Sequence, residues 1–203
     1  MITKSTIHIP LPIYITLGVI LAILSASCGA PRPVRKEEAP PVRARPAVRI
    51  DDLEKQIHAL INRERTQQGL SSLTGNEELT RIARKHSQDM AKRNYFSHQS
   101  PEGRGFSWRY AQGGYSCGVT AGDRIYMGAE NIFQNNLYDR VVYLNGVPRY
   151  DWNSARKIAE TTVQGWMNSP GHRKNILTPH WRSEGIGVAI SPDDKIYITQ
   201  NFC

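Results

Sequence analysis

Two histidines directly follow segments that have a helical pattern of apolar residues. His98 lies in NYFSHQSPEG, and His172 lies in WMNSPGHRKNIL after a Ser-Pro-Gly break. Ser169 is a favourable helix cap and Pro170 a favourable first helical residue, so His172 is expected in the first turn of a short helix. The positive end of that helix disfavours imidazolium, which predicts a neutral His172 near pH 7 that can accept a proton or bind a metal ion.

A third candidate is Glu130 in the sequence GAENI, where no helical pattern calls for a carboxylate. A glutamate between apolar residues is either buried with partners or placed in a cleft. Together with His98 and His172 it could form a small site for zinc or another divalent cation, or an acid–base cluster. These three residues are far apart in the chain, and the alternative is that each only hydrogen-bonds a loop.

Three helices are predicted from apolar residues that recur every three or four positions. They cover residues 52–68, 77–94 and 155–167. Each has a polar cap residue before it: Asp51 or Asp52, Asn76, and Asn153 or Ser154. His86 lies on the apolar face of the second helix and is interpreted as a core histidine.

Two strands are predicted near the C-terminus, at residues 186–191 and 195–202. Asn145-Gly146 is the favoured two-residue turn of a β-hairpin, and Pro148 marks its second arm as an edge strand. Helices and strands that are grouped in this way indicate an α+β fold.

The region 97–127 is rich in glycine and is predicted to be irregular. It contains GYSCG, which matches the G-x-S-x-G pattern of a nucleophile elbow. That motif needs a strand before it and a helix after it, and neither pattern is present here. Ser116 is therefore interpreted as a loop serine.

The first 28 residues have the pattern of a targeting segment. An apolar run at 13–24 is too short for a comfortable membrane span and suits the core of a signal peptide. The following SASC resembles the end of a bacterial lipoprotein signal, in which Cys28 would carry the lipid, although Ser25 stands where such signals favour leucine. Ordinary cleavage near the small residues 25–30 and an uncleaved short anchor are the alternatives, and each of them exports the domain.

Residues 29–49 form a Pro- and Arg-rich linker between this segment and a domain at 50–203. The chain carries a net charge of +8, and the linker holds six basic residues against two acidic ones. A basic tail beside an anchor favours attraction to anionic headgroups or wall polymers. A nucleic-acid partner is not expected, because the positive charge does not lie on the folded domain.

Cysteine usage is consistent with export. If Cys28 carries lipid, Cys117 and Cys203 remain as an even pair in an oxidising compartment. A disulfide between them would hold a loop and the chain terminus, which are places where folds tend to fray. The alternative is two unpaired thiols.

Several ordered motifs resemble one family. They are, in chain order, NYFSH, AENI, WMNSPGHRKNIL, GIGVAI and YITQNF. Through these motifs the region 53–202 is similar to the prokaryotic branch of the CAP superfamily (cysteine-rich secretory proteins, antigen five and pathogenesis-related proteins; the SCP-like domain). The resemblance implies an α-β-α sandwich with a small antiparallel sheet between helical layers and a large cleft on one side.

The same resemblance implies that two histidines and two glutamates line the cleft and hold a divalent ion in some members. His98, Glu130 and His172 match three of these positions. The place of the second glutamate falls at Ser169 or nearby, so this chain has three of the four residues. This departure puts zinc binding in question.

Three functions agree with these features. The first is an exported, membrane-anchored or secreted binding module whose cleft takes an envelope lipid, glycan or peptide, with or without a divalent metal. The second is a metal-dependent hydrolase with His98 or His172 as the base, which the missing glutamate disfavours. The third is a structural surface protein without catalysis. We favour the first for this extracytoplasmic domain.

Overall fold

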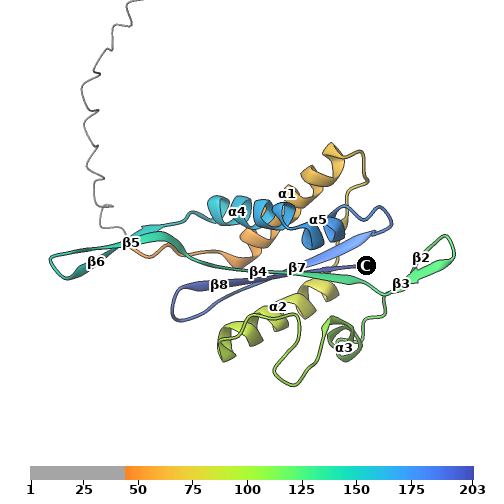
Figure 1. Cartoon of the computed structure of the whole chain (residues 1–203), viewed down its shortest axis with the longest axis horizontal. Coiled ribbons are helices and arrows are strands. Elements are labelled where there is room, and N and C mark those ends of the chain that lie inside the picture. The colour runs from red at the N-terminus through yellow and green to blue at the C-terminus, as the bar shows by residue number, and fades with distance from the viewer. Residues whose placement is uncertain (1–43) are drawn as a thin grey trace, which may run out of the picture. The chain divides into compact units, whose positions relative to one another are not determined.

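A four-stranded sheet forms the centre of the fold (Figure 1). The computed structural model describes residues 44–203, so the predicted signal segment, Cys28 and most of the linker lie outside the described residues. The strands lie in the order β1 (Thr74–Gly75), β7 (Ser183–Ile190), β8 (Lys195–Phe202) and β4 (Ala129–Asn136). The β1–β7 pair is parallel, and the other two pairs are antiparallel.

Helices cover both faces of this sheet, and Figure 1 shows the three layers. One layer contains α2 (Glu77–Arg93) and the short α3 (Phe106–Gln112). The opposite layer contains α1 (Ile50–Gln67), α4 (Ala155–Asn168) and α5 (Pro170–Ile176). This arrangement confirms the α+β class and the α-β-α sandwich that the family resemblance implies.

The main core lies between the sheet and the layer of α1 and α4. Its fully buried residues include Leu53, Ile57 and Ile61 of α1 and Trp166 of α4. These positions recur every three or four residues, so one face of each helix is removed from water. The indole Nε1 of Trp166 donates a hydrogen bond of 2.9 Å to the carbonyl of Ile132, which ties α4 to β4.

Strand β7 and helix α2 approach each other closely through two glycines. A Cβ atom at Gly185 would lie 2.1 Å from the backbone nitrogen of Thr80, and one at Gly187 would lie 2.0 Å from that of Arg84. No side chain fits at these distances, so the GIGV sequence permits the contact between helix and strand. This contact fixes the α2 layer against the sheet.

A carboxylate of α1 binds the exposed edge of β7. Glu54 accepts a hydrogen bond of 3.0 Å from the backbone N–H of Val188. Arg84 of α2 also contacts Glu54 through two nitrogen–oxygen pairs, of which the Nε–Oε1 distance is 2.8 Å. The two helical layers are thereby joined around the edge of the sheet, which explains why Glu54 is buried.

The predicted β-hairpin is present and projects from one end of the domain (Figure 1). It consists of β5 (Tyr138–Leu144) and β6 (Val147–Trp152), which pair in antiparallel fashion. Asn145 and Gly146 have φ values of 52° and 77°, as a two-residue turn with left-handed residues requires.

The helix caps agree with the sequence at two of the three helices. The Asn76 side chain accepts from the N–H of Leu79, and the Ser154 side chain accepts from that of Lys157. The prediction for α1 was wrong, because the helix begins at Ile50 and the two aspartates lie in its first turn. Acidic side chains in a first turn stabilise the helix through its dipole without capping it.

The prediction of an irregular region at 97–127 was also wrong in part. It contains α3 and a small hairpin of β2 (Val119–Ala121) and β3 (Arg124–Tyr126). Elements this short have weak local preferences and depend on tertiary contacts. Tyr110 supplies such contacts for α3: its ring is buried, and its hydroxyl donates to the carbonyl of Phe202 at 3.0 Å.

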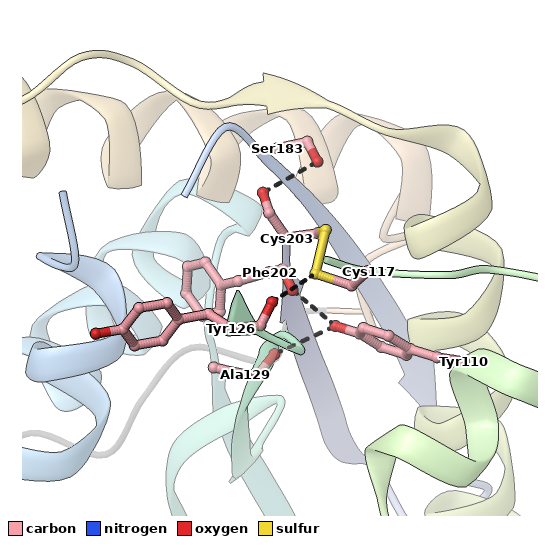
Figure 2. The surroundings of a disulfide bond; sticks show 7 residues. All are labelled: Tyr110, Cys117, Tyr126, Ala129, Ser183, Phe202 and Cys203. Atoms are coloured by element: carbon pink, nitrogen blue, oxygen red, sulfur yellow. Dashed lines mark hydrogen bonds between the residues drawn. A yellow bond between two sulfur atoms is a disulfide. The ribbon is translucent and has the colours of Figure 1, made fainter. Parts of the chain in front are cut away.

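The structure joins Cys117 to Cys203 by a disulfide, as the sequence predicts (Figure 2). The two Cα atoms are 5.6 Å apart, and the residues are separated by 86 positions. The bridge ties the loop before β2 to the end of β8. Ser183 on β7 donates to the carbonyl of Cys203 at 3.3 Å, so the C-terminal residue is held on both sides.

Candidate functional site

His98 and Glu130 are in direct contact at the edge of the sheet. The His98 Nδ1 lies 2.9 Å from Oε1 of Glu130. The Glu130 side chain is 1% exposed, whereas that of His98 is 49% exposed. When the carboxylate is ionised, Nδ1 carries the proton and donates it, so Nε2 is left as the imidazole nitrogen available to a ligand. Glu130 thus fixes the orientation and tautomer of His98.

Arg109 of α3 holds the other oxygen of the same carboxylate. Its Nη2 donates to Oε2 of Glu130 at 2.6 Å and also to the carbonyl of His98 at 3.1 Å. The Arg109 side chain is 9% exposed, so this is a buried ion pair. A buried carboxylate requires a compensating charge, and Arg109 supplies it. This role of Arg109 could not be predicted, since no sequence pattern links α3 to GAENI.

The backbone before β4 places Glu130 in this position. Gly128 has φ of +100°, which side-chain-bearing residues rarely adopt. A Cβ atom there would lie 2.9 Å from the carbonyl oxygen of Phe202 and 2.8 Å from the Tyr110 ring. The chain therefore turns sharply against β8 and enters β4, where Glu130 pairs with Asn201.

His172 approaches from the other helical layer. Ser169 is the cap residue of α5 and Pro170 its first residue, as predicted, but no side-chain hydrogen bond caps the helix. The His172 and His98 ring centroids are 6.2 Å apart. Burial, and then the charge of His98, lowers the pKa of His172. A lowered pKa agrees with the neutral imidazole that the sequence predicts, and burial is the largest cause of the shift.

A set of buried amides supports α5 beneath His172. Asn131 of β4 donates to the carbonyl of His172 at 3.2 Å and to Oε1 of Gln200 at 3.0 Å. Asn175 of α5 donates to Oδ1 of Asn131 at 2.9 Å and to the carbonyl of Glu130 at 3.3 Å. Asn175 lies one turn after His172 in GHRKN, and that spacing is the only signal that could have identified it.

The recess beside this contact has a volume of about 410 Å³. We call it the β4 recess. Its lining is about half polar and half apolar and contains the phenyl ring of Phe106. The polar side chains that line it are His98, Gln99, Ser107, Glu130 and Asn175. Hydroxyl, amide and imidazole groups around a single ring are suited to a ligand that is rich in hydroxyl or amide groups.

As a metal site, the three predicted residues do not form one ligand shell. Both oxygens of Glu130 are engaged, by His98 and by the guanidinium of Arg109. Across residues 44–203, no three His, Cys, Asp or Glu side chains form a group that could hold a metal ion. The two imidazoles are neighbours, with ring centroids 6.2 Å apart and an interplanar angle of 51°.

The other chemically suggestive residues have structural surroundings. His86 is 2% exposed, and its Nε2 lies 3.0 Å from the carbonyl of Ser97, which confirms a core histidine. Ser116 is exposed in a loop with neither helix nor strand beside it, which confirms a loop serine. Ser97 Oγ accepts the N–H of Gln99 at 3.1 Å.

Asn201 was not identified from the sequence, although it faces the same side of the sheet as Glu130. Its side chain is fully buried, and neither of its amide atoms has a hydrogen-bond partner among residues 44–203. Unpaired polar atoms at this depth are a usual place for an internal water molecule.

Comparison with known proteins gives consistent relatives. The Bacillus subtilis protein YkwD is 36% identical over 144 residues, which are 70% of this chain and 44% of that protein. The B. subtilis membrane protein YlbC is 32% identical over 149 residues, which are 73% of this chain and 34% of that protein. This chain therefore spans less than half the length of each relative.

A solved structure shares the fold. It is an extracellular protein with an SCP domain from Bacillus anthracis, with 27% identity and a TM-score of 0.54, and the match covers 78% of this chain and 44% of that one. The sequence model of the cysteine-rich secretory protein family, CAP, matches residues 58–202, which is more than half of the chain. The chain therefore belongs to the cysteine-rich secretory protein (CAP) family.

Proposed function

We propose that this CAP-family protein is an exported binding module and that the β4 recess takes a glycan of the cell envelope. The lining of the recess carries the proposal, since the hydrogen-bonding side chains of His98, Gln99, Ser107 and Asn175 and the ring of Phe106 surround it. Sugars present hydroxyl groups to hydrogen-bonding side chains and apolar C–H faces to rings. A lipid would require an extended apolar lining, and the only apolar side chains of this recess are those of Phe106 and Ala129.

Export and attachment to the envelope are parts of the same proposal. The similar B. anthracis protein is extracellular, and YlbC is a membrane protein. In the part of this chain that the structure describes, no helix is long and apolar enough to cross a bilayer. Attachment would therefore involve the N-terminal segment, through a lipid on Cys28 or a short anchor, and both lie outside the described residues.

His98 and Glu130 have separate roles in this proposal. The imidazole Nε2 of His98 contacts the ligand, and Glu130 holds the ring from behind through Nδ1. A divalent cation such as zinc would be bound by the imidazole nitrogens of His98 and His172, and Glu130 would again orient the His98 ring. A bound cation would supply an additional attachment point for a hydroxyl or carbonyl oxygen.

The first experiment is a titration of the full chain with N-acetylglucosamine oligomers, followed by nuclear magnetic resonance. We expect the wild-type chain to bind these oligomers and His98→Ala to weaken the affinity by at least about tenfold. His180→Ala, which removes a histidine outside the β4 recess, should change the affinity by less than about twofold. Failure of the wild-type chain to bind these oligomers, together with His98-dependent binding of fatty acids or peptides, would exclude the glycan.

The second experiment is calorimetry with zinc alone. We expect His98→Ala and His172→Ala each to abolish zinc binding, and Glu130→Gln to weaken it by about 10- to 100-fold, as is usual for a residue that orients a ligand. If Glu130→Gln abolished binding as completely as His98→Ala does, the carboxylate would be a direct ligand. If the wild-type chain bound no zinc, the metal component of the proposal would be wrong.

A further inference from the structure

A second pocket lies between α2, the loop at residues 100–105 and α3. Its volume is about 390 Å³, within the usual range for small-ligand sites, and it shares no lining residue with the β4 recess. We call it the α2–α3 pocket. What this pocket binds does not depend on whether the β4 recess binds a glycan.

The α2–α3 pocket is strongly basic. Five cationic side chains line it against two carboxylates, those of Asp89 and Glu102. The cations are Arg81, Lys85, Arg93, Arg104 and Arg109. His86, which also lines the pocket, adds no charge at neutral pH, because burial lowers its pKa to about 4.

One of the five cations contacts both carboxylates. Arg93 donates from Nη2 to Oε1 of Glu102 at 2.5 Å, and its Nη1 lies 3.5 Å from Oδ2 of Asp89. The hydrogen bond from Arg93 lowers the pKa of Glu102 to about 2, so this carboxylate is ionised at neutral pH. The acidic side chains of the pocket are thus grouped around Arg93 alone.

Three other cations are left without a carboxylate partner among residues 44–203. Lys85 makes no ion pair or hydrogen bond there, and Arg81 donates to the carbonyl of Gly113 at 2.7 Å. The Arg104 guanidinium lies 4.3 Å from the ring centroid of Trp108, which is a cation–π contact. These positive charges are therefore available to an anion.

A buried donor on a lining residue is also unsatisfied. Arg109 contacts Glu130 through Nη2, but its Nε is buried and has no partner in the described part of the chain. A buried N–H without a partner is destabilising, so such groups usually meet an internal water molecule. Arg109 lines the α2–α3 pocket, but its Nε is closed to solvent, so an anion in the pocket would contact the other cations and not this donor.

We infer that the α2–α3 pocket binds a phosphate ester. A phosphate group carries between one and two negative charges near neutral pH and has several acceptor oxygens, which matches a cluster of guanidinium and ammonium donors. Trp108 is 41% exposed and lines the same pocket, so it offers apolar surface to the organic part of the ester. A phosphorylated polyol or sugar and a phospholipid headgroup share this chemistry.

The test titrates the full chain with glycerol 3-phosphate at low salt by calorimetry. We expect Arg104→Glu and Lys85→Glu each to weaken binding by at least about tenfold. Lys55→Glu is the matched control, since it makes the same change in net charge on an equally exposed lysine that lines a different cleft, on α1. Lys85 also reaches that cleft and Arg104 does not, so Arg104→Glu is the cleaner variant. Circular dichroism checks that each variant is folded.

Sedimentation with phosphatidylglycerol vesicles distinguishes the two sources of phosphate. Vesicle binding that Arg104→Glu removes and Lys55→Glu retains, without binding of glycerol 3-phosphate, would assign the pocket to a lipid headgroup. Binding of glycerol 3-phosphate with the same variant pattern would assign it to a soluble ester. The inference is wrong if wild type binds neither probe at about 10 mM phosphate, or if Lys55→Glu and Arg104→Glu weaken binding equally.

Discussion

His58 on α1 contacts Glu184 on β7, with 2.6 Å between Nδ1 of the imidazole and Oε1 of the carboxylate. The Glu184 side chain has no exposed surface, and its second oxygen accepts from Nε2 of Gln200 at 2.5 Å. Gln200 in turn accepts from Asn131, which holds the backbone of His172. A polar chain therefore runs beneath the helices from α1 to the β4 recess.

This contact predicts a pH dependence of stability. The hydrogen bond that His58 donates to Glu184 raises the pKa of His58, although burial opposes it. A raised histidine pKa means that the folded state holds the proton more tightly than the unfolded chain does. The stabilisation is therefore complete below the unfolded pKa of about 6.5 and is lost as pH rises through the higher folded pKa. The free energy of unfolding, measured with urea at several pH values, should show this loss in wild type and not in His58→Gln. The same pH dependence in both proteins would contradict the prediction.

His86 predicts the opposite trend at lower pH. Burial lowers its pKa to about 4. The unfolded chain therefore binds a proton at this histidine below about pH 6.5, whereas the folded chain binds it only near pH 4. Stability should fall as pH decreases from 6.5 to 4, by up to about 3 kcal/mol. Denaturant unfolding of His86→Leu should lack this contribution. An equal loss of stability in wild type and His86→Leu over that range would show that other groups cause it.

The pair of Arg109 and Glu130 predicts a large effect of removing one partner. Arg109→Ala leaves a buried carboxylate without its compensating charge and should lower the free energy of unfolding by about 3–5 kcal/mol. Glu130→Gln in the same chain should restore part of that loss. Arg156→Ala, which removes an arginine from an exposed pair with Glu160, is the control and should cost far less, because solvent screens an exposed ion pair. Equal costs for the two arginines would refute the proposed importance of burial.

The disulfide predicts a measurable contribution to stability. Linking Cys117 to Cys203 closes a loop across 86 positions, which destabilises the unfolded chain by about 4.6 kcal/mol in the chain-entropy model. Urea unfolding of the Cys117→Ala, Cys203→Ala double variant should show a loss of roughly 2–5 kcal/mol. Adding a reductant should destabilise wild type and leave the double variant unchanged. A reductant effect on both proteins would point to another cause.

The close approach of β7 and α2 predicts that Gly187 does not tolerate a side chain. A methyl group there would clash with the backbone of Arg84, which cannot move without displacing α2. Gly187→Ala should cost at least about 1–3 kcal/mol by overpacking, measured by thermal unfolding. Gly75→Ala is the control, because nothing lies within 4 Å of its Cβ position. Similar melting temperatures for both variants would mean that the two layers separate easily.

Part of this structure could be predicted because it depends on local physics. Asn76 and Ser154 cap their helices through bonds to residues three positions away, and the apolar faces of α2 and α4 follow from the period of the helix. Asn145-Gly146 forms its turn because both residues tolerate positive φ. These features are encoded within a few residues, so the sequence alone predicts them.

The candidate site was only partly predictable. His98, Glu130 and His172 were identified by residue type and by family resemblance, yet nothing in the sequence indicated Arg109 or Asn131, and only the spacing from His172 pointed to Asn175. Arg109 is 21 positions from Glu130, and Asn175 is 44 positions from Asn131. Contacts over such separations depend on how α3 and α5 pack against the edge strand β4, and sequence spacing carries no information about that packing.

The family, two capped helices, the hairpin turn and the cysteine pair could all be predicted from residue patterns. Folding was needed to show that β4 is an edge strand, that Glu130 is buried between His98 and Arg109, and that five cations line the α2–α3 pocket. The reason is physical: helix periodicity and turn geometry act between neighbours in the chain, whereas the burial and pairing of a charge depend on groups that folding brings together from distant segments.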